Sequence, residues 1–282
     1  MKIAILSDVH GNLAALQTVT DHIEAWGPDA VLVNGDVVNR GPDSRRCWDL
    51  VAAKRETAGW QINRGNHEDY VLKHTRPEPD PEHQGIQAEI NRNSRWTCAQ
   101  LDGRMQELAA LPDTAVFTAP DGSELHAWHA SVRGNQDGIF LGSGDGVVRA
   151  QIAPAPAVFV TSHIHFAYTR RLDETLIVNT GSAGQHCYGD TRASYAQVVW
   201  RNGVWRAEII RLPYDMAATE RAYFDSGFME ETGPMAQLIF REWKTAVPLL
   251  PAWRSQYFQA VLSGEIELEA SVQAFLAVNN GK

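Results

Sequence analysis

An alternation of strand-like and helix-like segments in the first 63 residues constrains the fold more than any other feature of the sequence. Apolar runs predict strands at residues 2–6, 29–36 and 60–63, and the segments between them predict helices at 12–26 and 42–56. The first helix has apolar positions at three- and four-residue spacing and stops at Gly27-Pro28. Strands that alternate with helices in this rhythm favour a parallel sheet.

The rest of the chain changes character twice. Residues 83–110 are predicted to be mostly helical, and short β runs with turns between them follow from residue 115 to 212. Asn202-Gly203 lies between two of these runs and is typical of a hairpin turn. From about residue 215 the pattern is helical again. We therefore expect an α/β (α+β) domain over 1–212, with a helical insert at 83–110 and a C-terminal helical extension over 213–282.

Composition and charge narrow the classes of function. The 282 residues are 44% hydrophobic and 21% charged, as in a globular protein with a full core. A net charge of −9 disfavours a broad electrostatic contact with nucleic acid, and no apolar run approaches the ~20 residues of a membrane span. Three scattered cysteines and an N-terminus without signal-peptide features predict a cytoplasmic protein. The Pro-rich segment 75–83 is predicted to be a loop or the boundary of an insert.

Each predicted strand end in turn carries a side chain that could bind a metal. The donors are Asp8 and His10, Asp36, Asn66 and His67, His126 or His129, and His163 with His165. Because ligand sites in open α/β sheets lie beyond the carboxyl ends of the strands, these loops are expected to converge. An Asp-x-His or His-x-His pair would place two side chains on one side of an extended backbone.

The donors are of one chemical kind and too numerous for one ion. Asp, His and Asn suit divalent Mn, Fe, Zn, Co or Ni, and two ions ~3.5–4 Å apart could share them, with Asp36 as a bridging carboxylate. Any one of these pairs alone occurs by chance in many loops. Their joint appearance after apolar runs predicts a metal site. Only one of His126 and His129 should reach it, because residues three apart on a strand face opposite sides; we favour His129, which a small-residue loop follows.

The order of these motifs resembles the calcineurin-like metallophosphoesterase superfamily. The motifs are Asp8-Val9-His10, Gly35-Asp36, Gly65-Asn66-His67-Glu68, His129 and Ser162-His163-Ile164-His165, within residues 1–212. Ser162 stands where Gly is usual. Residues 177–199 further resemble the bacterial small phosphodiesterase branch. The resemblance implies a four-layer αββα sandwich of two mixed sheets.

The same resemblance implies roles for single residues. Asp8, His10, Asp36 and His165 would hold one divalent or trivalent ion, and Asp36, Asn66, His129 and His163 a second. Hydrolysis would proceed by attack of a metal-bridging hydroxide on phosphorus. His67 would not bind metal, and would protonate the leaving oxygen or stabilise the transition state.

Residues 35–44 also resemble the corresponding segment of phosphoprotein phosphatases and bacterial symmetric diadenosine tetraphosphate hydrolases. In those families the Arg at the position of Arg40 binds a phosphate oxygen, so Arg40 is the second candidate catalytic residue. A surface ion pair with Asp43 is the alternative role for Arg40. The phosphatases carry Asp where Asn39 stands, which implies that His67 is less biased toward its protonated form. Arg64 and Glu68 are expected to form a structural ion pair.

These expectations define a first function and its alternatives. The first is a phosphodiesterase acting on a small phosphorylated substrate, most simply a nucleotide. The alternatives are a symmetric diadenosine tetraphosphate hydrolase, a protein phosphatase, or a non-catalytic interaction scaffold, which would be expected to have lost its ligands. Apolar residues of the extension, such as Phe224, Trp243 and Trp253, are expected to pack on the core, to form a lid or to support a homodimer.

Overall fold

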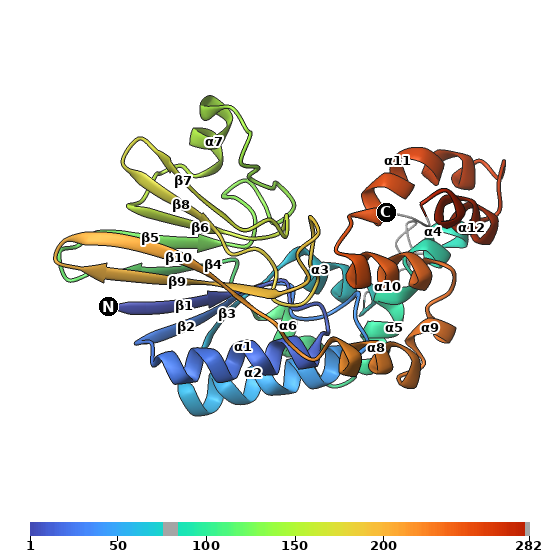
Figure 1. Cartoon of the computed structure of the whole chain (residues 1–282), viewed down its shortest axis with the longest axis horizontal. Coiled ribbons are helices and arrows are strands. Elements are labelled where there is room, and N and C mark those ends of the chain that lie inside the picture. Colours follow the sequence, from blue (N-terminus) through green and yellow to red (C-terminus); the bar gives the residue numbers. More distant parts are fainter. Residues whose placement is uncertain (76–83, 280–282) are drawn as a thin grey trace.

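The computed structural model describes residues 1–75 and 84–279, so most of the predicted 75–83 loop lies outside the described residues. Two five-stranded mixed sheets pack face to face (Figure 1). The first has the strand order β10 (Val204–Leu212), β9 (Ala193–Arg201), β1 (Lys2–Leu6), β2 (Ala30–Asn34) and β3 (Gln61–Asn63). The second has the order β4 (Thr114–Thr118), β5 (Glu124–Trp128), β6 (Val158–Thr161), β8 (Thr175–Asn179) and β7 (Tyr168–Leu172).

Strands β1 and β2 of the first sheet are mostly apolar, as expected of parallel strands with both faces buried. In β1, Ile3 and Ile5 belong to the core between the two sheets, whereas Ala4 and Leu6 belong to the core beneath the helices. Those helices are α1 (Leu13–Trp26) and α2 (Ser44–Ala58), which lie along the outer face of the first sheet (Figure 1). Strands β1, β2 and β3 are parallel, as the alternating pattern predicted.

The outer face of the second sheet is covered by one short helix, α7 (Asp145–Gln151), which the sequence reading did not predict. Val148 of this helix and Ile152 just after it pack on Phe159 and Ile177 of the sheet. The molecule therefore has the predicted αββα layers, although this last layer is thin. The β runs after residue 115 do not form a sheet of their own, since the β9–β10 hairpin joins the first sheet beside β1.

The helices outside the sandwich form two groups. The first group consists of α3 (Asn66–Leu72) and a 3₁₀ turn (Lys73–Thr75), followed by α4 (Gly85–Ile90), α5 (Arg92–Gln100) and α6 (Met105–Ala109) of the 83–110 insert. The C-terminal helices are α8 (Met216–Asp225), α9 (Phe228–Glu231), α10 (Met235–Thr245), α11 (Leu249–Leu262) and α12 (Leu268–Val278). The C-terminal helices have their own apolar clusters, into which Ile90 and Trp96 of the insert also pack.

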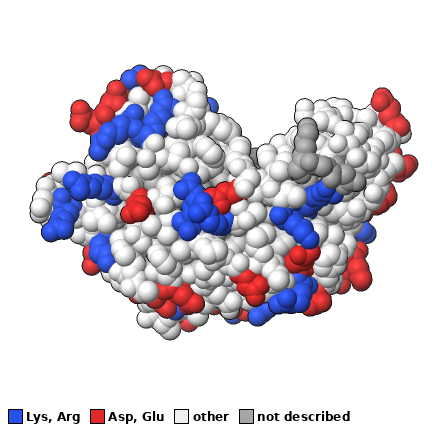
Figure 2. Space-filling view, viewed as in Figure 1, with Lys and Arg blue, Asp and Glu red and all other residues white. Residues whose placement is uncertain are grey.

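The surface is hollowed between the sandwich and the C-terminal helices (Figure 2). On the face drawn there, basic and acidic side chains are interspersed. Of the large apolar side chains in the extension, Phe228, Trp243 and Trp253 are buried, whereas Phe224 is 54% exposed. Packing thus accounts for the three buried side chains.

Candidate metal centre

The predicted donors follow five strands whose carboxyl ends meet. Strands β1, β2 and β3 run parallel in one sheet and β5 and β6 run parallel in the other. The loops after these strands lie at the end of the sandwich that faces the C-terminal helices (Figure 1). Convergence of strand ends from both sheets brings together side chains from residues 8 to 165.

One group of donors consists of Asp8, His10 and His165. Their ligand atoms all lie within 4.8 Å of one another. The Nε2 atoms of His10 and His165 are 3.1 Å apart, and His165 Nε2 lies 3.1 Å from Asp8 Oδ1. The other Asp8 oxygen accepts a hydrogen bond from Ser7 Oγ, which fixes the carboxylate.

A second group consists of Asp36, His129 and His163, whose ligand atoms also lie within 4.8 Å of one another. Asn66 adjoins this group, since its Oδ1 lies 3.0 Å from His129 Nε2 and 2.9 Å from His163 Nδ1. Both of these nitrogens and the amide oxygen can act as metal ligands.

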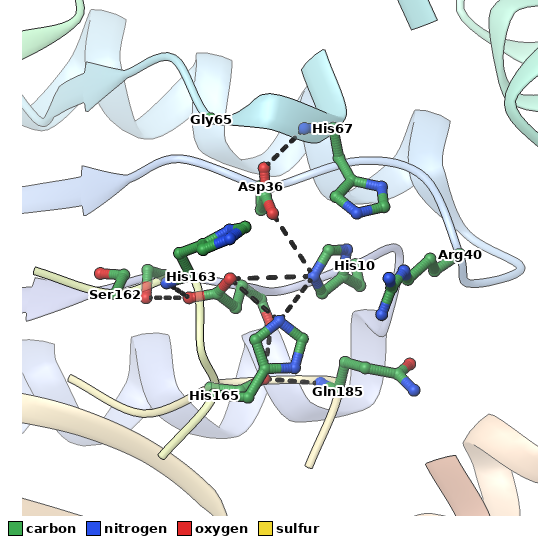
Figure 3. A network of polar contacts seen from close by, with 12 residues as sticks. His10, Asp36, Arg40, Gly65, His67, Ser162, His163, His165 and Gln185 are labelled. Carbon is green, nitrogen blue, oxygen red and sulfur yellow. Dashed lines mark hydrogen bonds and ion pairs between the residues drawn. The ribbon is translucent and has the colours of Figure 1, made fainter. Parts of the chain in front are cut away.

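Asp36 belongs to the second group and also lies close to His10 of the first. Its Oδ2 lies 3.3 Å from His129 Nε2 and 3.6 Å from His10 Nε2. Its Oδ1 accepts a hydrogen bond from the His67 backbone N–H at 2.8 Å (Figure 3). A single carboxylate oxygen therefore faces imidazoles from two clusters, which is the position that a bridging ligand requires.

The backbone of these loops is left-handed rather than extended, so the expectation of an extended Asp-x-His and His-x-His was wrong. The residues at positive φ include Asp8, His10, Asp36, Asn39, Arg40, His163 and His165. Such conformations cost a non-glycine residue on the order of 1–3 kcal/mol each and concentrate at functional sites. Neighbouring loops support the strained backbone through hydrogen bonds, such as His10 N–H to the Asp36 carbonyl at 3.0 Å.

Glu68 supports the loop after β2 from beneath. Its buried carboxylate accepts hydrogen bonds from the backbone N–H groups of Asp36, Val37, Val38 and Gly65. Burial and the charge on Asp36 raise the pKa of Glu68 to about 7, and the backbone donors oppose that rise. Glu68 is thus a positioning group, a role that the sequence analysis did not assign.

Arg64 does not pair with Glu68, and that expectation was wrong. Its guanidinium instead contacts Asp69 at 3.3 Å and Asp113 at 2.8 Å, toward the surface. The backbone donors around Glu68 occupy its carboxylate, and only Arg64 and Gly65 separate β3 from α3. Arg64 and Glu68 are close in sequence, but the turn between β3 and α3 prevents them from forming an ion pair.

The hydrogen bonds around His129 and Asp8 leave lone pairs that a cation could accept. His129 Nδ1 lies 2.8 Å from the Asn34 carbonyl oxygen, so Nδ1 carries the donated proton. In neutral His129 the Nε2 lone pair then faces Asn66 Oδ1 and Asp36 Oδ2, a concentration of lone pairs that only a proton or cation can stabilise. Buried Asp8 Oδ1 accepts no hydrogen bond from any residue in the described part of the chain, and so remains available to a cation.

The pKa values indicate the same demand for positive charge. Burial opposes the charged imidazole, but the carboxylate of Asp36 raises the pKa of His129 to about 9, and that of Asp8 raises the pKa of His165 to about 10. Burial lowers the pKa of His163 to about 4 and holds that of His10 well below its usual value. The cluster thus binds protons at some nitrogens and presents neutral donors at others, as expected of a cation site.

His67 forms a third group with His10 and Asp36, whose ligand atoms also lie within 4.8 Å of one another, but its Nδ1 has a different partner. Its Nδ1 is 3.0 Å from Asn39 Nδ2. The orientation of that amide is fixed because Asn39 Oδ1 accepts from the Arg40 backbone N–H, which can only donate. His67 Nδ1 is therefore an acceptor, and its proton resides on Nε2. Burial holds the pKa of His67 well below its usual value, so the ring is neutral.

Arg40 lies at the edge of the cluster that faces α10, and its side chain is 26% exposed. Figure 3 shows its guanidinium beside His10 and Gln185. Its ion-pair partner is Glu242 of α10 at 3.5 Å, and not Asp43, which pairs with Arg46. The surface alternative for Arg40 is therefore wrong, because Glu242 is buried.

His126 is separated from the cluster. It contacts Glu124 two residues away on the same strand at 2.8 Å. His129, by contrast, is buried among the donors. Ser162 occupies the usual Gly position without entering the cluster, because its hydroxyl bonds Asn34 and Thr180.

Two cavities flank the donors. One of about 260 Å³ is lined by His165 together with Phe166, Tyr188 and Arg192. The other, of about 340 Å³, is lined by His129 together with Arg64, Trp128 and Arg133. Each cavity thus shares one predicted metal ligand with the centre and offers aromatic and basic side chains beyond it.

Comparison with known proteins identifies this class of fold and site. The sequence profile of the calcineurin-like phosphoesterase family matches residues 1–177, and the chain belongs to that family. It is therefore a metal-dependent phosphoesterase, and its substrate is a phosphorylated molecule. The search of curated proteins found no match.

Solved structures show the same fold. The chain is 25% identical to a metallophosphoesterase from Sphaerobacter thermophilus, with a TM-score of 0.68 over 88% of this chain and 99% of that one. It is 18% identical to the hypothetical protein PH1004 from Pyrococcus horikoshii OT3, with a TM-score of 0.70 over 83% of this chain and 97% of that one. Over residues 1–75 and 84–279, none of the helices is both long and apolar enough to span a membrane.

Proposed function

We propose that this phosphoesterase hydrolyses phosphodiesters of small nucleotides at a centre of two metal ions. Asp8, His10, Asp36 and His165 would hold the first ion, and Asp36, Asn66, His129 and His163 would hold the second. The observation that carries the proposal is the position of Asp36 Oδ2, which faces His10 and His129 at once. The ions are Mn, Fe, Zn, Co or Ni, as the mixed nitrogen and oxygen donors suit.

The ions supply positive charge for the phosphate oxygens and lower the pKa of water. Arg40 adds a second source of positive charge at the edge of the centre, and its planar guanidinium suits two phosphate oxygens at once. His67, neutral with its proton on Nε2, donates that proton or a hydrogen bond to the leaving-group oxygen. Asn39 keeps the proton on Nε2 by donating to Nδ1.

The cavity beside His165 supports a nucleotide as the substrate. Phe166 and Tyr188 line it with their ring centroids 4.8 Å apart, and Tyr188 is 56% exposed. Aromatic faces stack on nucleobases of any sequence. A symmetric diadenosine tetraphosphate hydrolase is the second candidate, favoured by the placement of Arg40 and His67 beside the donors.

A panel of metals and substrates tests the proposal. Protein loaded with Mn, Fe, Zn, Co or Ni is assayed against an aryl phosphomonoester, an aryl phosphodiester, 2′,3′-cyclic nucleotides and diadenosine tetraphosphate. We expect the highest kcat/KM with a phosphodiester and about two ions per chain by elemental analysis. One ion per chain would overturn the two-ion centre. The highest kcat/KM with the monoester would overturn the phosphodiesterase activity. Intact protein without bound metal or activity would instead favour a scaffold.

We also propose that residues 1–212 form the catalytic domain and 213–282 an extension. The end of β10 at Leu212 and the start of α8 at Met216 support this boundary. The insert over 83–110 belongs to the catalytic domain, because Asn93 and Ser94 bond Asn39 beside His67. A homodimer through the extension, and a cytoplasmic location, remain predictions.

A further inference from the structure

One polar side chain of the C-terminal extension reaches the candidate site. Glu242 of α10 is 2% exposed, and its Oε1 lies 3.5 Å from Arg40 Nη1 and 3.4 Å from Gln185 Nε2. Its Oε2 accepts a hydrogen bond from the Leu250 backbone N–H at 2.9 Å. A buried carboxylate is unfavourable unless it is paired and hydrogen-bonded, and Arg40 supplies the positive charge.

The extension contacts Arg40 at a second point. The Tyr223 hydroxyl on α8 donates to the Arg40 carbonyl oxygen at 3.4 Å. The backbone of Arg40 is left-handed, with φ at 64°, and its N–H donates to Asn39 Oδ1. Both ends of the residue are therefore fixed, the backbone by Tyr223 and Asn39 and the guanidinium by Glu242.

This arrangement leaves Arg40 free to bind an anion. Of its five guanidinium N–H groups, those on Nη1 face Glu242. Within the described parts of the chain the guanidinium makes no other hydrogen bond, and its side chain is 26% exposed. The guanidinium lies beside His10, on the side of the metal donors (Figure 3).

We propose that Glu242 is a positioning residue that holds Arg40 in the orientation for binding phosphate, so that the C-terminal extension forms part of the substrate site. The proposal rests on the proposed role of Arg40 as a phosphate-binding residue. An arginine side chain has many rotamers in solution, and fixing it beforehand removes an entropic cost from substrate binding. The alternative is that the contact only attaches the extension to the catalytic domain.

The test measures binding of inorganic phosphate to the Mn-loaded protein by titration calorimetry. The variants are Arg40→Ala, Glu242→Gln, the double variant and a matched control, Glu231→Gln. Glu231 is another carboxylate of the extension that bonds the insert, at Trp96 Nε1, and does not contact Arg40. We expect Glu242→Gln to weaken phosphate binding about tenfold with unchanged manganese content, and Glu231→Gln to leave it unchanged.

The double variant separates positioning from attachment. If Glu242 acts through Arg40, Glu242→Gln has no further effect once Arg40 is Ala. Equal weakening in both backgrounds, or no weakening by Glu242→Gln alone, would overturn the inference while leaving the role of Arg40 intact. Unchanged binding in Arg40→Ala would instead show that the proposed function of Arg40 is wrong.

Two further measurements keep the test decisive. In the metal-free protein, amide hydrogen exchange at residues 36–44 should become faster in Glu242→Gln. It should stay unchanged there in the control, Glu231→Gln. Unchanged exchange in both variants would contradict a positioning role for Glu242. If Glu242→Gln does not fold, Glu242→Asp draws the carboxylate away from Arg40 and should also weaken phosphate binding. Wild-type affinity in that variant would overturn the proposal.

Discussion

The loops of the metal centre and the C-terminal helices are built in contrasting ways. The loops bury charged and polar side chains on left-handed backbone, with Asp8, Asp36 and His129 each at most 1% exposed. The helices bury large aromatic side chains, such as Trp243 and Trp253, on regular backbone. The loops therefore place donor side chains together at a cost in conformational energy, whereas the helices stabilise the fold by burying apolar surface. The comparison suggests that damage to each region should have a different signature.

Loss of the shared carboxylate should have the largest effect. Asp36→Asn removes the negative charge that both donor groups face, and we expect kcat/KM to fall more than about 10³-fold with fewer ions per chain. Elemental analysis and the phosphodiester assay measure both effects, and circular dichroism checks that the fold persists. Wild-type metal content in this variant would contradict the bridging role.

Loss of His67 should separate catalysis from metal binding. We expect His67→Ala to lower kcat about 10²–10⁴-fold while the metal content stays near the wild-type value, because His67 Nδ1 bonds Asn39. His126→Ala is the matched control, since His126 lies outside the donor groups and should leave kcat unchanged. A parallel loss of metal and activity in His67→Ala would show that His67 is a ligand.

A methyl group at Gly65 should weaken metal binding. A Cβ at Gly65 would lie 2.1 Å from Asp36 Oδ1 and 2.6 Å from the Asp36 nitrogen, so Asp36 must move. We expect Gly65→Ala to weaken metal binding about 10–100-fold, as for other changes that displace a ligand. Gly144→Ala is the control, because nothing lies within 4 Å of its Cβ position. Equal metal affinity in the two variants would mean that the Asp36 loop adapts at little cost.

Damage to the core of the extension should show the opposite signature. Trp253 is 1% exposed, and Trp253→Ala should lower the free energy of unfolding by about 3–5 kcal/mol. The ions bound per folded chain should stay at the wild-type number, because Trp253 contacts no metal donor. Urea denaturation followed by fluorescence measures the first quantity and elemental analysis the second. Loss of metal from the folded variant would show that the two regions are more tightly coupled than their contacts indicate.

Apolar periodicity predicted the parallel strands, and the order of the short motifs gave the resemblance to the family, which in turn implied the αββα class. Both signals are local. The sequence could not predict that Asp8 and His10 adopt left-handed backbone, since that conformation is supported by hydrogen bonds that their N–H groups donate to carbonyls of the loop after β2. It also missed α7, a helix of seven residues whose cover of the second sheet is decided by packing. The β9–β10 hairpin was recognised, but its sheet was not, because strand pairing depends on distant partners.

The sequence alone determined which side chains stand at each strand end, and therefore the chemistry available, because each motif is read within a few residues. Only the tertiary structure decided which atoms share a space: Asp36 Oδ2 between His10 and His129, and Glu242 beside Arg40, 202 positions away. The motif around Arg40 gives no sign of Glu242. In α10, Glu242 interrupts the buried face formed with Leu238 and Ile239, which marks the residue but does not reveal its partner. Contacts of that range depend on how two separately built regions pack, which no local pattern records.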